Sequence, residues 1–184
     1  MVDQTHKQHG DSSSLHHFEE VFMPHLDAAY NLARWLLRHE QNAEDAVQEA
    51  FLRAFKAFPR FRGGEGKPWL MTIVRNVCYT TIKKLRHQDL LEPFDEVVHQ
   101  SANSLATSEL HQQMANAETL HRALEKLAPE HREIIVLHDL EGLSYKEIAT
   151  VTAIPIGTVM SRLARARGRL RQEIIALNAK ESQP

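Results

Sequence analysis

The chain has 184 residues and a formal net charge of -2, and 42% of its residues are hydrophobic, which is enough to bury the cores of one or two small domains. A single cysteine, Cys78, excludes an internal disulfide and a cysteine-rich zinc site and fits a reducing cytoplasm. The polar residues 1–15 lack the apolar core of a signal peptide, and no later run has a membrane-spanning length, so we expect neither export nor membrane insertion.

The balance of residue types favours helices over strands. Glycine and proline occur seven times each, while the good helix formers Leu, Ala, Glu and Arg are abundant. We therefore predict an all-α fold of two small helical domains joined by a flexible linker, with a helix-turn-helix in the C-terminal domain. The predicted segments are a disordered N-terminus at 1–14, a first domain at 15–88, a linker at 89–115 and a second domain at 116–178.

The first well-marked helix is predicted to begin at Asn42, because Asn42 and Asp45 have the spacing of a capping box. From Ala43 to Phe58, apolar residues recur at intervals of three and four, so this side of the helix should face the core. An acidic first turn is also favoured by the helix dipole, so the opposite face could simply be solvated. The exposed or partly exposed residues of that face are Asp45, Gln48, Glu49 and Leu52.

A second helix is predicted over about 68–87, since Pro68 suits a first turn and the glycine-rich residues 63–66 precede it. One of its faces is polar, cationic and partly aromatic. Such a face could accept a nucleic acid strand, because rings stack on bases while cations meet phosphates. We expect Trp69 to lie in the core, and the pattern leaves both a core and a stacking role open for Tyr79. The residues of the polar face are Thr72, Asn76, Tyr79, Lys83 and Arg86.

Charge is unevenly distributed along the chain. Residues 60–87 contain seven Lys or Arg against one acid, and residues 155–171 contain five Arg and no acid. Between them, residues 88–120 contain no Lys or Arg. Two basic patches therefore flank an acidic connector, and the weak periodicity and the serines of this connector favour a flexible linker.

Three helices are predicted in the helix-turn-helix domain. Pro129 begins the first. Ser144 and Glu147 form a capping box that starts a short helix over 145–152. A longer, arginine-rich helix begins near Ile156. A short helix, a tight turn and a longer cationic helix are typical of a helix-turn-helix whose second helix enters the major groove of DNA.

The chain resembles extracytoplasmic-function (ECF) sigma factors of the bacterial sigma-70 family in both predicted domains. The stretch AEDAVQEAFLRAF (43–55) is similar to their polymerase-binding helix, and WLMTIVRN (69–76) is similar to the helix that reads the -10 promoter element. LAPEHREIIVLHDLEGLSYKEIA (127–149), followed by IPIGTVMSRLARARGRL (154–170), is similar to the reader of the -35 element. The order and spacing of these stretches together are specific to the family.

The resemblance implies a non-enzymatic subunit that binds core RNA polymerase and directs promoter-specific initiation at -10 and -35 elements. The first domain would be sigma region 2 and the second sigma region 4. It also implies promoter DNA as a partner, both as duplex and as melted strand, and control by an anti-sigma factor. The expected location is the cytoplasm, at the nucleoid through RNA polymerase or at the membrane through the anti-sigma factor. No cofactor and no small-molecule substrate are expected.

The resemblance also assigns site residues. The acidic helix face would meet arginines of the polymerase clamp in charge-assisted pairs. We expect Arg62, Lys67 and Asn76 to hold the melted strand. The core-polymerase set is Asp45, Gln48, Glu49 and Leu52, and the -10 set is Arg62, Lys67, Thr72, Asn76, Tyr79, Lys83, Lys84 and Arg86, the last three on phosphates of the upstream duplex.

For the -35 element, Ser161 and Arg165 are expected to reach base edges, since Arg can grip guanine through two hydrogen bonds. The remaining side chains are expected to hold phosphates or to lie beside them. The -35 set is Thr158, Met160, Ser161, Arg162, Arg165 and Arg167.

The sequence departs from the family pattern in three places. Ala153 stands at the helix-turn-helix corner where Gly is frequent, which costs up to about 1 kcal/mol in left-handed backbone. Met160 stands where many members have Arg, which weakens the transfer of a particular -35 sequence. Residues 66–68 stand where aromatic residues are common, so the pocket for an unstacked base differs.

Two other functions fit parts of the sequence. A stand-alone transcriptional regulator would bind duplex operators through its helix-turn-helix while its N-terminal domain dimerises or senses a signal. A metal-dependent hydrolase would use some of the twelve histidines, but no constellation of nucleophile, base and ligands and no His-Glu-x-x-His motif is visible. We therefore predict no metal site.

Overall fold

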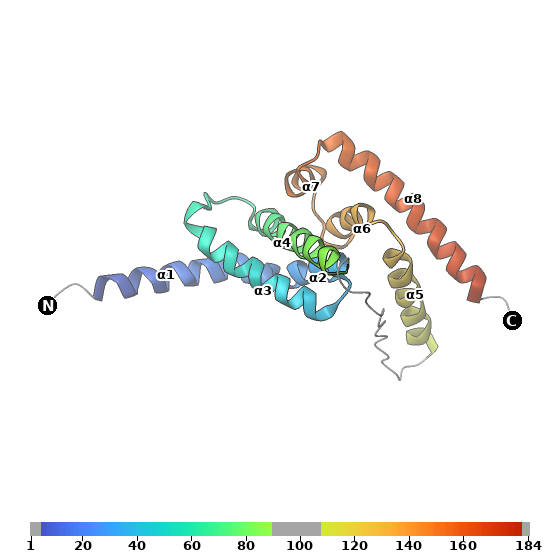
Figure 1. Ribbon diagram of the computed structural model, residues 1–184, viewed down its shortest axis with the longest axis horizontal. Coiled ribbons are helices and arrows are strands. Elements are labelled where there is room, and N and C mark those ends of the chain that lie inside the picture. The colour runs from blue at the N-terminus through green and yellow to red at the C-terminus, as the bar shows by residue number, and fades with distance from the viewer. Residues whose placement is uncertain (1–4, 90–107, 182–184) are drawn as a thin grey trace.

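The computed structural model describes residues 5–89 and 108–181, and within these ranges the chain is helical without a strand (Figure 1). This confirms the predicted all-α fold with two helical regions. Residues 1–4, 90–107 and 182–184 lie outside the described residues, and with them most of the predicted linker and its flexibility.

The N-terminal region is a bundle of three helices, α2, α3 and α4, from which α1 extends (Figure 1). In α2 the buried residues Ala29, Leu32, Ala33 and Leu36 recur at spacings of three and four, so one side of this helix is apolar and faces its neighbours. The elements of the region are α1 (Thr5–Phe22), η1 (Met23–His25), α2 (Leu26–Leu37), α3 (Glu40–Ala57), η2 (Phe58–Arg60) and α4 (Gly66–Asp89), where η1 and η2 are single 3-10 turns.

Helix α1 begins at Thr5, inside the segment 1–14 for which disorder is predicted. Phe18 and Phe22 anchor the C-terminal end of α1 in the core, with 5% and 0% exposure. Once a helix is nucleated, each further residue adds a hydrogen bond at little cost, so α1 extends beyond its anchor. The polar composition of the segment does not reveal this effect.

Helix α3 begins at Glu40, so the predicted start of this helix at Asn42 is wrong. Arg38 ends α2 in a left-handed conformation with φ of 66°, and His39 is extended and caps α3 without a side-chain hydrogen bond. The Ala43 amide donates to the His39 carbonyl at 3.0 Å, which closes the first turn. Asn42 therefore lies inside the helix, and its spacing to Asp45 does not mark a capping box.

The C-terminal region contains four α-helices and one π-helical turn. Helix α5 starts at Ser108, inside the segment 89–115 that is predicted as linker. The helices predicted from Pro129, over 145–152 and from Ile156 are all present. The elements are α5 (Ser108–Glu125), α6 (Pro129–Ile135), the π-helical turn η3 (Val136–Leu140), α7 (Tyr145–Thr152) and α8 (Ile156–Glu181).

Local signals around α7 are confirmed. The Ser144 amide donates to the Glu147 carboxylate at 2.7 Å, and the Glu147 amide donates to the Ser144 hydroxyl at 3.3 Å, which makes a complete capping box. Ala153 ends the helix with φ of 55° and ψ of 38°. The corner between α7 and α8 is therefore left-handed at an alanine, the strained form that the sequence departure predicts.

Aromatic rings fill one end of the N-terminal bundle. The rings of Phe22 and Trp69 lie 5.0 Å apart between centroids, and those of Phe61 and Trp69 lie 5.2 Å apart. Phe18 and Phe58 make an edge-on contact at 5.5 Å. Trp69 therefore packs against the core, as expected, and its ring is engaged by neighbours of its own region.

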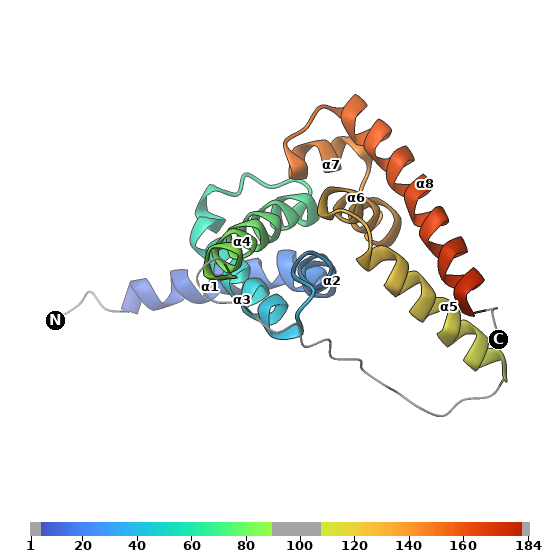
Figure 2. The same ribbon diagram turned by 45° about the vertical axis from the view of Figure 1, so that its right-hand side comes forward.

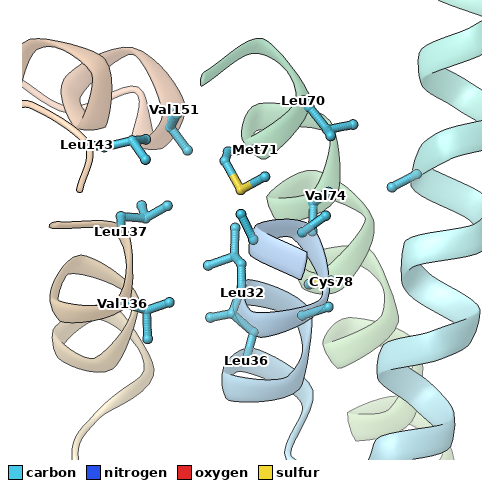
Figure 3. Packing of buried hydrophobic residues seen from close by; sticks show 14 of the residues in the cluster. Leu32, Leu36, Leu70, Met71, Val74, Cys78, Val136, Leu137, Leu143 and Val151 are labelled. Carbon is cyan, nitrogen blue, oxygen red and sulfur yellow. The ribbon is translucent and has the colours of Figure 1, made fainter. Parts of the chain in front are cut away.

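The two regions share one apolar interior. Leu32 of α2 and Met71 of α4 face Val136 and Leu137 of η3, with Leu143 and Val151 completing the contact (Figure 3). All of these side chains are at most 2% exposed. Helix α7 lies beside α4, and α6 lies beside α2 (Figure 2). We call this docking of the C-terminal region against the N-terminal region the closed arrangement. Since each buried side chain of this size stabilises by about 1.5–3 kcal/mol, burial of apolar surface favours the closed arrangement.

Candidate nucleic-acid and polymerase interface

Helix α8 carries most of the predicted -35 residues on its N-terminal half. Val159 and Leu163 are 0% and 2% exposed and fix the helix against α6 and α7, whereas Met160 on the other side is 52% exposed. Ser161 and Arg165 are exposed beside Met160. The structure thus brings these three predicted -35 residues together on one surface, while Thr158 and Arg162 are half-buried at its edges.

The polar side chains of this face rest on their own helix. The Ser161 hydroxyl donates to the Thr158 carbonyl at 3.2 Å, and Arg165 donates from Nε to the Ser161 carbonyl at 3.2 Å. Both contacts are local and exposed, so either side chain can turn outward to a base edge at small cost.

Arg167 differs from the other arginines of α8. Its guanidinium donates to both carboxylate oxygens of Asp139 on η3, at 3.0 Å from Nε to Oδ2 and through a second bond from Nη2 to Oδ1. This bidentate pair ties α8 to η3. The predicted phosphate role of Arg167 thus stays a prediction, and its guanidinium already has a partner within the C-terminal region.

The acidic face of α3 is open. Asp45 and Gln48 are exposed, Leu52 is 57% exposed, and the Glu49 carboxylate accepts from Arg53 Nε at 2.6 Å. A hollow of about 470 Å³ is lined by residues of α3 and α4. Its lining brings Asp45 and Glu49 close to Lys84, so residues of the polymerase set and the -10 set share one surface. The lining residues are Asn42, Asp45, Ala46, Glu49, Arg53, Val77, Thr80, Thr81 and Lys84.

The predicted -10 face of α4 is split between an exposed part and a covered part. Arg62, Asn76, Lys83, Lys84 and Arg86 are exposed. The other three predicted residues, Lys67, Thr72 and Tyr79, make hydrogen bonds within the protein.

Thr72 and Lys67 are engaged in different ways. The Thr72 hydroxyl donates to the Pro68 carbonyl at 2.9 Å within α4. Lys67 reaches the C-terminal region, where its Nζ lies 3.1 Å from Oε2 of Glu141 and donates to the Glu141 carbonyl at 2.6 Å. Asn31 of α2 also donates to Glu141, at 3.1 Å. Glu141 therefore joins two elements of the N-terminal region to the turn before α7.

Tyr79 meets a buried carboxylate. Its hydroxyl donates to Oε2 of Glu133 at 3.3 Å, and Arg75 donates from Nε to Oε1 of Glu133 at 2.7 Å. The Arg75 guanidinium also lies over the Tyr79 ring, 4.5 Å from its centroid. The side chain of Glu133 is 1% exposed, and burial raises its pKa while Arg75 lowers it. Burial and the nearby Glu133 raise the pKa of Tyr79 to about 12, so its phenol stays protonated as a donor.

Arg132 makes a third polar contact between the two regions. Its guanidinium donates to the carbonyls of Leu124, Glu125 and Leu127 around the end of α5, and to the Trp35 carbonyl of α2, at 2.8 to 2.9 Å. Burial, followed by the nearby Arg38, lowers its pKa to about 10, which still leaves it charged at neutral pH. Four carbonyl groups at helix ends are thereby satisfied by one side chain.

Sequence reasoning missed Arg75, Arg132 and Glu133. The spacing between Arg75 and Tyr79 places both on one face of a helix, and that signal could have added Arg75 to the -10 set. Nothing local reveals the partners of Arg132 and Glu133, because those partners lie in the other region. Within the described ranges, no group of three or more His, Cys, Asp or Glu side chains could hold a metal ion, and no described helix is long and apolar enough to cross a membrane.

Comparison with known proteins agrees with this architecture. The family model for sigma-70 region 2 matches residues 21–88, and the model for sigma-70 region 4 matches residues 117–170. The chain therefore belongs to the sigma-70 family, whose members are transcription regulators rather than enzymes.

The similar proteins define the group more closely. The chain is 31% identical over 177 residues to the ECF RNA polymerase sigma factor SigE of Mycolicibacterium smegmatis, covering 95% of this chain and 68% of the relative. It is 35% identical over 134 residues to the ECF sigma-E factor of Escherichia coli, covering 67% and 69%. Within the sigma-70 family it is an ECF-type member.

Two solved structures share its fold. The sigma factor RpoE of Bartonella quintana, crystallised with the anti-sigma factor NepR, superposes with a TM-score of 0.71 at 31% identity, covering 85% of this chain and 96% of that one. CnrH, solved with the cytosolic domain of CnrY, gives a TM-score of 0.59 at 25% identity, covering 86% and 88%.

Proposed function

We propose that this protein binds core RNA polymerase through region 2 and directs it to promoters by reading a -10 element with α4 and a -35 element with α8. We place region 2 at 15–88 and region 4 at 116–178. It acts as a binding subunit in the cytoplasm, and no catalytic step is assigned to it. The observation that carries this proposal is that one chain holds an open acidic face on α3 and two separate cationic helices, α4 and α8.

The residue assignments follow from exposure and chemistry. Asp45, Gln48, Glu49 and Leu52 form the polymerase contact, because carboxylates beside an exposed Leu suit a partner with arginines and an apolar rim. In the -10 set, Arg62, Asn76, Lys83, Lys84 and Arg86 are exposed, and Thr72 is half-buried. Lys67 and Tyr79 act after the regions separate. In the -35 set, Ser161 and Arg165 read bases beside Met160, and Thr158, Arg162 and Arg167 hold phosphates.

We further propose control by an anti-sigma factor. RpoE of Bartonella quintana was co-crystallised with the anti-sigma factor NepR, and CnrH was solved in complex with the cytosolic domain of CnrY. In this chain the closed arrangement covers part of the -10 face, so a protein that stabilises it would keep the chain inactive.

The test is transcription in vitro from a promoter library with bacterial core polymerase and the purified chain. We expect the chain to direct transcription from a subset of promoters with a shared -35 and -10 pattern. Arg165→Ala should reduce transcription from these promoters by about tenfold while binding to core polymerase is kept, since one bidentate base contact is worth about 1–3 kcal/mol. Equal loss of both activities would remove Arg165 from the DNA interface. Duplex binding without any polymerase-dependent transcription would favour a stand-alone regulator.

A further inference from the structure

The covered end of the α4 face has the chemistry of a strand-binding site. Arg75, Tyr79, Lys83 and Arg86 follow one another at spacings of four, four and three, so they form one stripe along α4. Lys83 and Arg86 are exposed, whereas Arg75 and Tyr79 lie against the C-terminal region. A cation, a ring and a phenolic donor in sequence are groups that bind a nucleic acid backbone and its bases.

An internal anion already occupies this end. The two oxygens of the Glu133 carboxylate accept from Nε of Arg75 at 2.7 Å, from Nη2 of Arg75 at 3.5 Å and from the Tyr79 hydroxyl at 3.3 Å. A guanidinium fork with one added hydroxyl holds two oxygens of a phosphate in the same way. The Glu133 side chain is 1% exposed and the Arg75 side chain is 20% exposed, so Glu133 covers most of the Arg75 guanidinium and competes with any external anion for it.

A similar contact occurs further along the face. Lys67, one of the residues that we assign to the melted strand, is paired with Glu141 at 3.1 Å. Two carboxylates of the C-terminal region thus pair with two cations of α4, Glu133 from α6 and Glu141 from the turn between η3 and α7. In both contacts a cation of the N-terminal region meets a carboxylate of the C-terminal region, and both contacts lie outside the apolar core of the interface.

We propose that Arg75 and Tyr79 form a phosphate-binding site for a single DNA strand, and that Glu133 occupies it as an intramolecular competitor. The inference rests on the proposed function, since it extends the -10 face of α4 to a residue outside the predicted set. Strand binding and the Glu133 contact exclude each other, so the affinity of the free chain for a strand is reduced by the fraction of molecules that are closed.

The experiment measures binding of a fluorescein-labelled single-stranded oligonucleotide of mixed sequence to the full chain by fluorescence anisotropy. Glu133→Lys should tighten binding by about tenfold, because the internal competitor is lost. The matched control is Glu118→Lys, the same charge change at an exposed site of α5, and it should shift the affinity much less. An equal gain in both variants would overturn the proposal, since it would show a general charge effect.

A second pair of variants keeps the proposal testable if Glu133→Lys fails to fold. Arg75→Ala should weaken strand binding and lower the slope of log affinity against log salt by about 0.7, the value for one lost contact to a single strand. Where Glu133→Lys does fold, combining it with Arg75→Ala should give no gain over Arg75→Ala alone. Unchanged affinity and slope in Arg75→Ala would refute the site. Promoter-directed transcription by the wild type is scored separately, so that failure of this site and failure of the proposed function are distinguishable.

Discussion

Arg132 and Glu133 are neighbours in the chain and both side chains are buried, yet their environments differ. Arg132 is surrounded by four carbonyl acceptors and so is fully used as a donor. Glu133 has one guanidinium and one hydroxyl as partners, and burial still raises its pKa. Arg132 therefore stabilises the fold, whereas burial of the Glu133 charge costs folding free energy.

Arg132→Ala should lower the free energy of unfolding by about 3 kcal/mol, because it removes four hydrogen bonds from one buried, charged donor. Urea denaturation followed by circular dichroism measures this change. Arg53→Ala serves as the control, since the exposed pair of Arg53 with Glu49 should contribute no more than about 0.5 kcal/mol. A loss of similar size in both variants would contradict the role given to Arg132.

Glu133 predicts a pH dependence with a defined sign. Burial is the main cause of its raised pKa, opposed by Arg75, Tyr79 and Arg162. A raised carboxyl pKa means that the folded protein binds the proton more tightly, so the contribution is present below the ordinary pKa and is lost as pH rises through the raised value. The unfolding free energy of Glu133→Gln relative to wild type should therefore increase as the pH rises above the ordinary carboxyl pKa. A flat or falling difference in denaturation midpoints would contradict this.

At the scale of single elements, local chemistry accounts for what sequence reasoning found. The capping box of Ser144 and Glu147 is written in four consecutive residues, and it is present as predicted. The start of α3 was not accessible in this way, because the left-handed turn at Arg38 decides it and no glycine or asparagine marks that position. The extent of α1 was not accessible either, because the side chains that hold it, Phe18 and Phe22, lie at its C-terminal end.

The corner at Ala153 gives an element-scale prediction. Ala153→Gly should stabilise the protein by about 0.5–1 kcal/mol, since glycine adopts φ of 55° without the steric cost of a Cβ. Thermal unfolding measures the effect. Ala164→Gly, at an exposed position inside α8, is the matched control and should destabilise by about 1 kcal/mol. Destabilisation by both substitutions would show that the corner is not strained.

At the scale of the molecule, the two regions close on one another through an apolar centre with polar contacts around it. Leu137 and Met71 lie in that centre, and Lys67, Arg75 and Arg132 bridge its edges. None of these pairings could be predicted from the sequence, because each joins residues far apart in the chain whose separate patterns only indicate burial or exposure. The sequence of each region was sufficient to predict most of its helices, but it was not sufficient to predict how the two regions pack against each other.

Because the closed arrangement covers part of the -10 face, binding to polymerase should open it. Dyes placed at Glu44→Cys on α3 and Gln172→Cys on α8, both exposed, would report the separation of the regions by energy transfer. Adding core polymerase should lower the transfer efficiency, while adding an unrelated protein should not. Unchanged efficiency in a stoichiometric complex would mean that the regions stay docked on the polymerase.

The central claim is that the acidic face of α3 docks this chain on core RNA polymerase, and co-elution in size-exclusion chromatography at moderate salt tests it most directly. The wild type should form a stoichiometric complex, and Asp45→Lys should weaken it, because the substitution places a cation where a carboxylate meets arginines. Glu19→Lys, the same charge reversal at an exposed site of α1, should leave the complex intact. Failure of the folded wild type to co-elute, or equal binding by Asp45→Lys, would contradict the account.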